Sequence, residues 1–541
     1  MIVVEDDSIS EEVVSMNLAP VKRLDEKDDS CELDDNGLAE STGIAHRVFS
    51  ATHRGQSFSM GGGKPLPPLP ALSKEAYRVD YEGPDDPYHP YNWPSRRKLV
   101  TYICLVYTSL CVTMGSAVYS PASEVIAKKY NVGSVVTILG TSVYILGFAS
   151  GPVVWGPISE NKFGRKSPSI VSIFLFTIFS FGAAVSKDLQ TLIICRFFAG
   201  LTGSAPWAVV VASFSDLYDN SHRGKPIIVF MFVTFMGPLV GPIVGAFLTN
   251  SNLGWRWTQY ISGIMGAVAL IVDILFVEET YHPLLLAYKA KALRKATGNW
   301  AIYAAHEEKE INLNDIVTKT VARPIVMLFT EPILLLISVY TAFIYGILYL
   351  FLEAYPIVFA GYGLTGGVEQ LPYFALVIGL GIASLSIAYI LDPQYRKKLL
   401  ANGGKPVPEA RLPAMIYGGI AFPIGIFWFT WTGNYPQHIH WIVPTLSGMF
   451  TGYSLLAIFQ PAISYLVEAY PTYAASALAA ATFVRSSFGA TFPLFAGAMF
   501  HNLGINWAGT VIGCLGLIMV PVPILFLRYG QQIRARSKFG V

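Results

Sequence analysis

The sequence predicts an all-α integral membrane protein, and three observations support that fold class. Of its 541 residues, 53% are hydrophobic and only 14% are Asp, Glu, Lys or Arg, whereas soluble globular proteins carry roughly 25% charged residues. The mean hydropathy is positive, at +0.47. Beyond residue 98, apolar runs of about 20 residues recur, and each is long enough to cross the ~30 Å hydrocarbon layer of a bilayer as a helix.

We expect about twelve membrane-spanning helices, in two sets of six. The spans lie near residues 99–119, 135–156, 169–187, 190–213, 226–249 and 258–277, and then near residues 333–358, 372–391, 413–432, 441–465, 475–499 and 508–528. Two six-helix bundles separated by a polar segment are the layout of transporters built from structural repeats.

The polar segments complete the predicted organisation. Residues 1–90 are acidic and contain the run GGGKPLPPLP, a composition that predicts a disordered cytoplasmic tail. The other predicted parts are an N-terminal six-helix bundle (91–278), a cytoplasmic middle loop with an amphipathic helix at the membrane surface (279–325), a C-terminal six-helix bundle (326–530) and a basic cytoplasmic tail (531–541). Lys and Arg concentrate in alternate loops, which predicts that both termini are cytoplasmic.

No feature of the sequence predicts catalysis. The nine histidines lie in the tail, in loops or at span edges, whereas a haem site or a buried imidazole base needs histidine inside the bilayer. The sequence has no metal-ligand cluster, no nucleophile elbow and no nucleotide-binding loop. We therefore expect a protein that is not an enzyme, that holds no metal or cofactor, that binds no nucleic acid, and that draws its energy from an ion gradient.

The loop between the second and third spans reads GPISENKFGRK and carries the first candidate motif. Gly156 and Gly164 suit bends, and Glu160 suits a pair with a nearby base. Arg165 and Lys166 can reach carbonyls at helix C-termini, so the loop can clamp two helix ends together. The alternative is an ordinary loop of the positive-inside pattern.

The fourth span contains Arg196, with Gly200 and Gly203 on the same helical face. An arginine in mid-helix costs about 2.5–3.5 kcal/mol on insertion scales, so it is expected to face a cavity or a partner. The alternative is an arginine that extends toward the membrane surface.

The fifth span contains GPLVGPIVGA. Gly237, Gly241 and Gly245 recur every four residues and form a flat ridge for close helix contact. Pro238 and Pro242 lie between them and remove backbone hydrogen bonds, which bends a helix. The alternative is generic packing of small residues, but two Gly-Pro pairs in strict register make this motif more specific.

Few acids lie at membrane depth, and one of them must exchange the proton if a proton gradient drives the protein. The candidates are Asp273, late in the sixth span, and Glu353, late in the seventh, while Asp216 and Glu468 lie near span ends. We favour Glu353, because aromatic residues surround it. The alternative is a structural role for Glu353, as partner of a helix end or of Arg485 in the eleventh span.

Aromatic side chains of the second half are candidates for the wall of a central cavity. The candidate lining residues are Tyr345, Tyr349, Phe450 and Tyr453. Such rings suit amphiphilic or planar molecules. For any one of these rings, lipid contact is the alternative.

The three motifs resemble the signature motifs of the major facilitator superfamily, and the fifth-span motif resembles the antiporter motif of its drug–proton antiporters. Further stretches are similar to the fungal twelve-span branch, which includes multidrug, toxin and polyamine exporters. These stretches are DPYHPYNWPSRRK (86–98), WRWTQYI (255–261), EETYHPLLLAYKAKALRK (278–295), LYLFLEAYPIVF (348–359) and SALAAATFVRSSFGATFPLFA (476–496). The resemblance covers about residues 86–530, although Glu160 replaces the usual Asp and one extra residue precedes Gly164.

The resemblance implies a role for each motif. The loop from Gly156 to Arg165 would form the cytoplasmic gate, Arg196 would belong to the proton-coupling network, and the ridge around Gly241 would form an interdomain hinge. The implied protein is a monomeric exporter of drugs, toxins or secondary metabolites in the plasma membrane, driven by proton entry through alternating access.

Alternatives stay open at this stage. They are polyamine–proton antiport, proton-coupled uptake, a non-transporting membrane sensor and, for location, a vacuolar membrane.

Overall fold

The computed structural model describes residues 74–83, 85–86, 88–160, 163–219, 223–308, 322–535, 537 and 539. Within these residues the chain is helical, and one isolated bridge pairs Arg78 with Tyr303. The predicted all-α class is confirmed. The predicted tail before residue 74 lies outside the described residues, as does the middle-loop segment 309–321.

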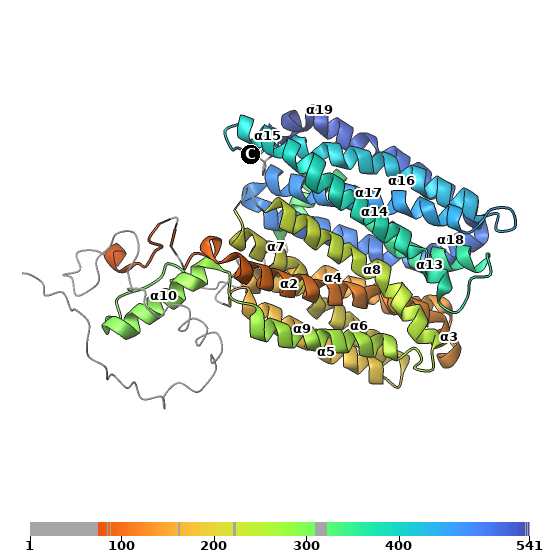
Figure 1. Cartoon of the computed structure of the whole chain (residues 1–541), viewed down its shortest axis with the longest axis horizontal. Coiled ribbons are helices and arrows are strands. Elements are labelled where there is room, and N and C mark those ends of the chain that lie inside the picture. The colour runs from red at the N-terminus through yellow and green to blue at the C-terminus, as the bar shows by residue number, and fades with distance from the viewer. Residues whose placement is uncertain are drawn as a thin grey trace, which may run out of the picture. The chain divides into compact units, whose positions relative to one another are not determined.

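Seven long helices and one short one make up the first half (Figure 1). They are α2 (Ser95–Ala117), α3 (Ser123–Tyr130), α4 (Ser134–Glu160), α5 (Lys166–Val185), α6 (Leu189–Gly203), α7 (Ala205–Leu217), α8 (Gly224–Asn250) and α9 (Trp257–Phe276). The predicted fourth span corresponds to α6 and α7 together. The break falls at Ser204, two residues before Pro206 in the first turn of α7, because proline cannot donate the backbone hydrogen bond that would continue the helix.

The second half repeats this plan with longer helices. They are α12 (Arg323–Thr330), α13 (Pro332–Ala360), α14 (Tyr373–Ser386), α15 (Asp392–Ala401), α16 (Leu412–Gly433), α17 (Ile442–Ala469), α18 (Ala474–Met519) and α19 (Pro521–Ala535). A single π-helical turn, Ile387–Leu391, joins α14 to α15.

Eleven helical stretches of the described residues are long and apolar enough to cross a membrane, and the last, Ala474–Ala535, runs for 62 residues. At 1.5 Å per residue this stretch is about three times the hydrocarbon thickness, so it holds two crossings. Gly504, with φ 77° and ψ 163°, breaks the helix between them. Each of the twelve predicted spans therefore corresponds to a helical segment of the structure.

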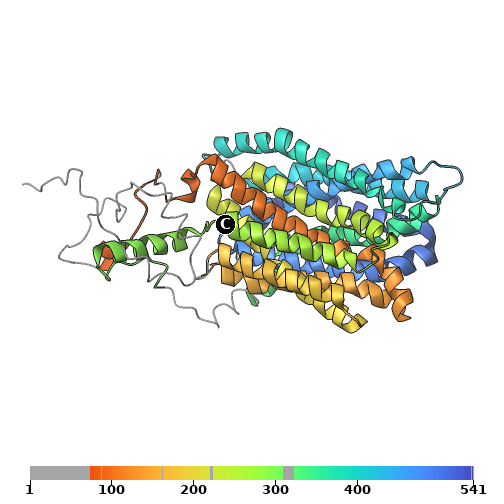
Figure 2. The same ribbon diagram turned by 60° about the horizontal axis from the view of Figure 1, so that its bottom comes forward.

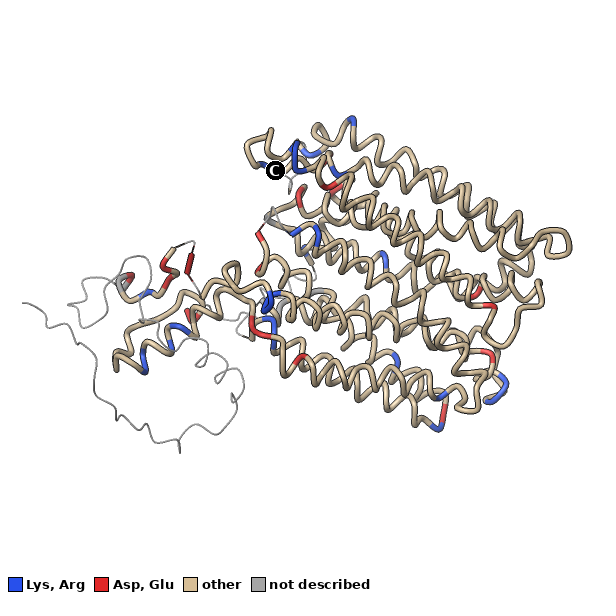
Figure 3. Tube along the Cα trace, in the orientation of Figure 1, with Lys and Arg blue, Asp and Glu red and all other residues tan. Residues whose placement is uncertain are grey.

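The two halves meet along two pairs of helices, α4 against α18 and α8 against α14. Within each half the helices pack on one another through buried apolar side chains, while many apolar side chains on the outer faces are exposed. Figure 3 shows that charged residues gather at the two ends of the helices and are sparse between them. This distribution fits helices whose middle sections lie in hydrocarbon.

The middle loop forms a helix, α10 (His282–Thr297), that ends at Gly298 in a left-handed conformation. This helix extends beyond the ends of the spanning helices (Figure 2). Its apolar side packs on Val79, Ile302 and Ala304. The chain itself covers this side, and the predicted location of the helix at the membrane surface stays a prediction.

The prediction of a disordered tail over residues 1–90 is wrong for the last part of that segment. Asp86 lies 3.4 Å from Lys289 of α10 in an ion pair whose side chains are almost fully buried. The backbone N–H groups of Glu82 and Tyr88 donate to the same carboxylate. The sequence alone hides this order, because the charge that compensates Asp86 lies about two hundred residues away.

Candidate functional site

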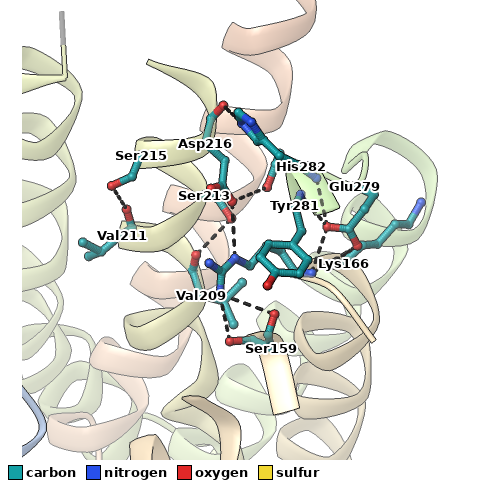
Figure 4. A network of polar contacts seen from close by, with 12 residues as sticks. Ser159, Lys166, Val209, Val211, Ser213, Ser215, Asp216, Glu279, Tyr281 and His282 are labelled. Carbon is teal, nitrogen blue, oxygen red and sulfur yellow. Dashed lines mark hydrogen bonds and ion pairs between the residues drawn. The ribbon is translucent and has the colours of Figure 1, made fainter. Parts of the chain in front are cut away.

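The segment GPISENKFGRK covers the last turn of α4 and the start of α5, and its Arg165 guanidinium is buried among Ser159, Asp216 and Tyr281 (Figure 4). Arg165 Nε lies 3.3 Å from Asp216 Oδ2, at the end of α7. Arg165 Nη1 donates to Ser159 Oγ at 3.1 Å, and the guanidinium carbon lies 4.9 Å from the centre of the Tyr281 ring. The arginine therefore joins α4, α7 and the segment after α9, while the role of this segment as a clamp stays a prediction.

Glu279 holds the backbone of this loop, and the sequence reasoning missed it. Its carboxylate accepts hydrogen bonds from the N–H groups of Arg165 and Lys166 at 2.9 and 3.1 Å, and from those of Thr280 and Tyr281 at 3.0 and 2.9 Å. Burial raises the pKa of Glu279, while the N–H groups of Arg165, Tyr281 and Lys166 favour its ionised form. The available signal was an acidic pair, Glu278 and Glu279, directly after the sixth span.

The two glycines of the loop differ in their surroundings. Gly164 has φ +68°, and a Cβ there would collide with the Glu279 carboxylate, so this position needs glycine. Nothing lies within 4 Å of the place where a Cβ of Gly156 would be. The side chain of Glu160, the predicted acid of the motif, lies outside the described residues.

The second half has a similar ion pair. Arg411 Nε lies 2.7 Å from Glu468 Oε1, at the end of α17, and its guanidinium covers the Tyr395 ring at 3.7 Å. Tyr395 also donates its hydroxyl to Glu468. An arginine before α16 and an acid ending α17 thus repeat the arrangement of Arg165 and Asp216.

Arg196 is 1% exposed and lies inside the first half. Its donors reach acceptors on three other helices: Gly140 O of α4, Gln259 Oε1 of α9 and Ser116 O of α2, at 2.6, 3.1 and 3.1 Å. The guanidinium carbon also lies 4.4 Å from the centre of the Tyr119 ring. Arg196 does not extend to the surface, and it joins three helices of the first half through two backbone carbonyls and one side-chain amide oxygen.

The glycine ridge of α8 faces α2, which belongs to the same half. A Cβ on Gly241 would lie 2.9 Å from Met114 O and 3.0 Å from Val118 N, the nearest neighbours of Gly237 are α2 residues, and those of Gly245 lie directly after α2. The ridge thus packs within the first half, although α8 also meets α14 of the second half, and its role as an interdomain hinge stays a prediction. Helical period identifies which residues share a face, but it does not identify the helix that this face meets. Pro238 and Pro242 are buried in the same helix.

Two of the four predicted cavity residues, Tyr345 and Tyr349, lie where the halves meet. The hydroxyl of Tyr349 lies 2.8 Å from Ser116 Oγ of α2 and 3.4 Å from the hydroxyl of Tyr345. The ring of Tyr345 also packs at the edge of Phe235 of α8. One turn along α13 from Tyr349, Glu353 Oε1 accepts a hydrogen bond from Ser120 of the first half at 3.5 Å.

Phe450 does not join this group. It is 40% exposed and packs on Trp428 of α16, with ring centres 5.7 Å apart. Tyr453 is partly buried beside α14, where its backbone N lies next to Gly379. The exposure of Phe450 agrees with the lipid-facing alternative, and its place in a cavity wall stays a prediction.

Asp273 is fully buried between α9 and α2. Thr108 Oγ1 lies 3.1 and 3.0 Å from its two carboxylate oxygens. The residue thus lies within the first half, whereas Glu353 reaches across to the other half.

Arg485 of α18 is also buried, but its surroundings are rings. Its guanidinium carbon lies 4.5 Å from the ring centre of Trp207, 5.1 Å from that of Tyr345 and 5.2 Å from that of Phe459. Among the described residues it has no ion-pair partner, so the pair with Glu353 that was the alternative for that acid is not formed.

Comparison with known proteins gives the family. The model of the Major Facilitator Superfamily matches residues 105–493. The chain belongs to this superfamily. Its members are transporters, and this chain is a multi-pass membrane transporter rather than an enzyme.

Named fungal relatives match this superfamily member over most of its length. It is 50% identical to a Candida glabrata protein called Multidrug transporter TPO1_2, over 89% of this chain and 82% of that one. It is 49% identical to the Candida albicans protein called Major facilitator superfamily multidrug transporter FLU1, over 89% and 79% of the two chains.

Solved structures agree on the fold of the superfamily. A partially occluded, inward-open structure of the xylose transporter XylE from E. coli aligns with a TM-score of 0.57 at 20% identity, over 80% of this chain and 98% of that chain. A structure of the same proton:xylose symporter with a bound sugar analogue aligns with a TM-score of 0.58 at 16% identity, over 81% and 96%.

Proposed function

We propose that this superfamily member exports small amphiphilic molecules in exchange for protons, by alternating access between its two halves. The observation that carries this proposal is the near 50% identity, over most of both chains, to fungal proteins named multidrug transporters. Alternating access requires two bundles that rock about a shared interface. Residues 91–278 and 326–530 are the two bundles, and the middle loop of residues 279–325 joins them.

The interface supplies polar groups suited to this cycle. Ser116 and Ser120 of the first half meet Tyr349 and Glu353 of the second. Glu353 is the acid that we assign to the proton, because it bridges the halves, whereas Asp273 bonds to Thr108 inside one half. Gain or loss of a proton changes the charge at this contact and so biases its opening.

The loop motif acts as the cytoplasmic gate in this proposal. The pair of Arg165 with Asp216 and the Glu279 carboxylate hold the ends of four spans together. In the second half, the pair of Arg411 with Glu468 joins the start of α16 to the end of α17. Both termini face the cytoplasm, the protein resides as a monomer in the plasma membrane, and the molecules leave the cell.

Export can be tested in fungal cells with and without the full chain. Retention of labelled neutral, cationic and anionic amphiphiles, together with spermidine, is measured before and after a protonophore collapses the proton gradient. We expect the chain to lower retention of several amphiphiles at least threefold, and the protonophore or Glu353→Gln to restore it.

The matched control is Glu369→Gln, which removes a carboxylate from the exposed segment between α13 and α14. Equal retention of every amphiphile with and without the chain would contradict export. Full export by Glu353→Gln would instead remove Glu353 from the proton pathway. Selective loss of spermidine alone would favour polyamine antiport.

A further inference from the structure

Arg485 is a cation enclosed by aromatic rings at the junction of the two halves. Trp207 comes from α7 of the first half, while Tyr345 and Phe459 come from α13 and α17 of the second. The arginine is 4% exposed. Cation–π contact with three rings compensates for part of the hydration that the guanidinium loses on burial.

Within the part of the chain that the structure describes, this guanidinium has a donor that is not used. Arg485 Nε is buried and has no hydrogen-bond partner. No carboxylate among the described residues forms an ion pair with Arg485, whereas Arg165, Arg411 and Arg534 each have one. A buried cation without a counter-charge is unfavourable, so such a group is retained where another molecule supplies the missing acceptor.

We propose that Arg485 binds the anionic group of transported molecules, and that these include organic anions with a planar apolar body and a carboxylate or similar group. This assignment rests on the proposed export function and specifies its substrate class. The planar guanidinium suits two parallel hydrogen bonds to a carboxylate. The rings of Trp207, Tyr345 and Phe459 suit the apolar body that carries it.

Arg196 does not compete for the same ligand, because carbonyl and amide oxygens of the protein already accept from its donors. The position of Arg485 also disfavours polycations. A second buried positive charge beside an unpaired guanidinium is repelled more strongly at the low dielectric of the interface than in water. The site therefore selects against polyamines.

Direct binding tests the assignment. The full chain, purified into lipid nanodiscs, is titrated with tritiated 2-naphthoate and with 2-naphthamide, a neutral molecule of nearly the same shape. We expect 2-naphthoate to bind at least tenfold more tightly. Arg485→Gln should weaken naphthoate binding at least tenfold and leave naphthamide binding within twofold.

Two further variants control for charge and for folding. Arg528→Gln removes the same charge from an exposed site on α19 and should leave both affinities within twofold. Arg485→Lys keeps the charge but loses the planar pair of donors, so naphthoate affinity should fall to an intermediate value. If Arg485→Gln does not fold, two measurements still test the assignment. They are the preference of the wild-type chain for 2-naphthoate over 2-naphthamide and the naphthoate affinity of Arg485→Lys.

Equal affinity of the wild-type chain for 2-naphthoate and 2-naphthamide would overturn the assignment, as would an equal loss of both in Arg485→Gln. Neither result contradicts the proposed export of neutral amphiphiles. Failure of the export proposal gives a different result. The chain would then prefer 2-naphthoate in nanodiscs, which supports the anion site, but would lower the retention of no amphiphile in cells, which contradicts export.

Discussion

Arg196 and Arg485 are the same residue type at similar burial, and they differ in their partners. Arg196 lies inside the first half and donates to acceptors on α2, α4 and α9. Arg485 lies between the halves, among rings, with Nε unpartnered. The comparison teaches that burial of a charge does not by itself identify its role. A charge whose bonds are made within one half supports the fold, and a charge left unpaired between the halves is available to a ligand.

The largest expected effect comes from the arginine inside a half. Arg196→Gln should lower the free energy of unfolding by about 3 kcal/mol, because the shorter side chain leaves buried carbonyls without donors. Thermal unfolding of the detergent-purified chain, followed by size-exclusion chromatography, measures this. An Arg196→Gln protein as stable as the wild type, yet without proton-driven export, would place Arg196 in the coupling network instead.

The glycine ridge sharpens the same distinction. Gly241→Leu should destabilise the first half by about 2 kcal/mol, because its side chain would collide with the backbone of α2 around Met114. Gly156→Ala is the matched control and should be neutral, because its Cβ meets open space. A stable Gly241→Leu protein that leaks protons would support the interdomain role that the sequence had suggested.

A smaller effect is expected from a hydrogen bond between the halves. Ser116→Ala removes the 2.8 Å contact with Tyr349, and a hydrogen bond of this kind contributes about 1 kcal/mol. We expect little change in unfolding temperature and a change of about fivefold in export rate. Ser487→Ala, which removes only a bond to the preceding turn of α18, should change neither quantity.

The smallest effect concerns a histidine outside the spans. Burial and the neighbouring His282 lower the pKa of His89, and Lys98 acts in the same direction against Asp86. A lowered pKa means that the folded contact prefers neutral imidazole, so its stability holds above the unfolded pKa and falls as the pH drops below about 6.5.

Hydrogen exchange of residues 88–92 can check this, once rates are corrected for intrinsic exchange. Protection should fall between pH 7.5 and pH 5.5, and His89→Gln should abolish that difference. Equal protection of the wild type at both pH values would contradict the expected titration.

The fold was predictable because hydropathy is a local property. The spans from residue 99 to residue 528 each correspond to a helix, and the loop from Gly156 to Lys166 lies where helix ends meet. The partners were not predictable, because they are set by packing. Asp86 is ordered by Lys289, and the ridge of Gly241 meets α2.

In the candidate site, too, the residues could be predicted from the sequence but their partners could not. Tyr345 and Tyr349 lie at the interface, and they were candidates because the seventh span is rich in aromatic residues. That Glu279 holds the loop backbone, and that Arg485 lacks an acid, depends on distances that only the folded chain defines.

One variant tests the account most directly, because the account assigns Arg485 to the transported molecule rather than to the fold. Unfolding temperature and export of 2-naphthoate from proteoliposomes are measured on the same preparation of Arg485→Gln. We predict an unfolding temperature equal to or above that of the wild type, because an unpaired buried charge is removed, and a fall in export of at least tenfold. A protein destabilised like Arg196→Gln that still exports 2-naphthoate at the wild-type rate would contradict it.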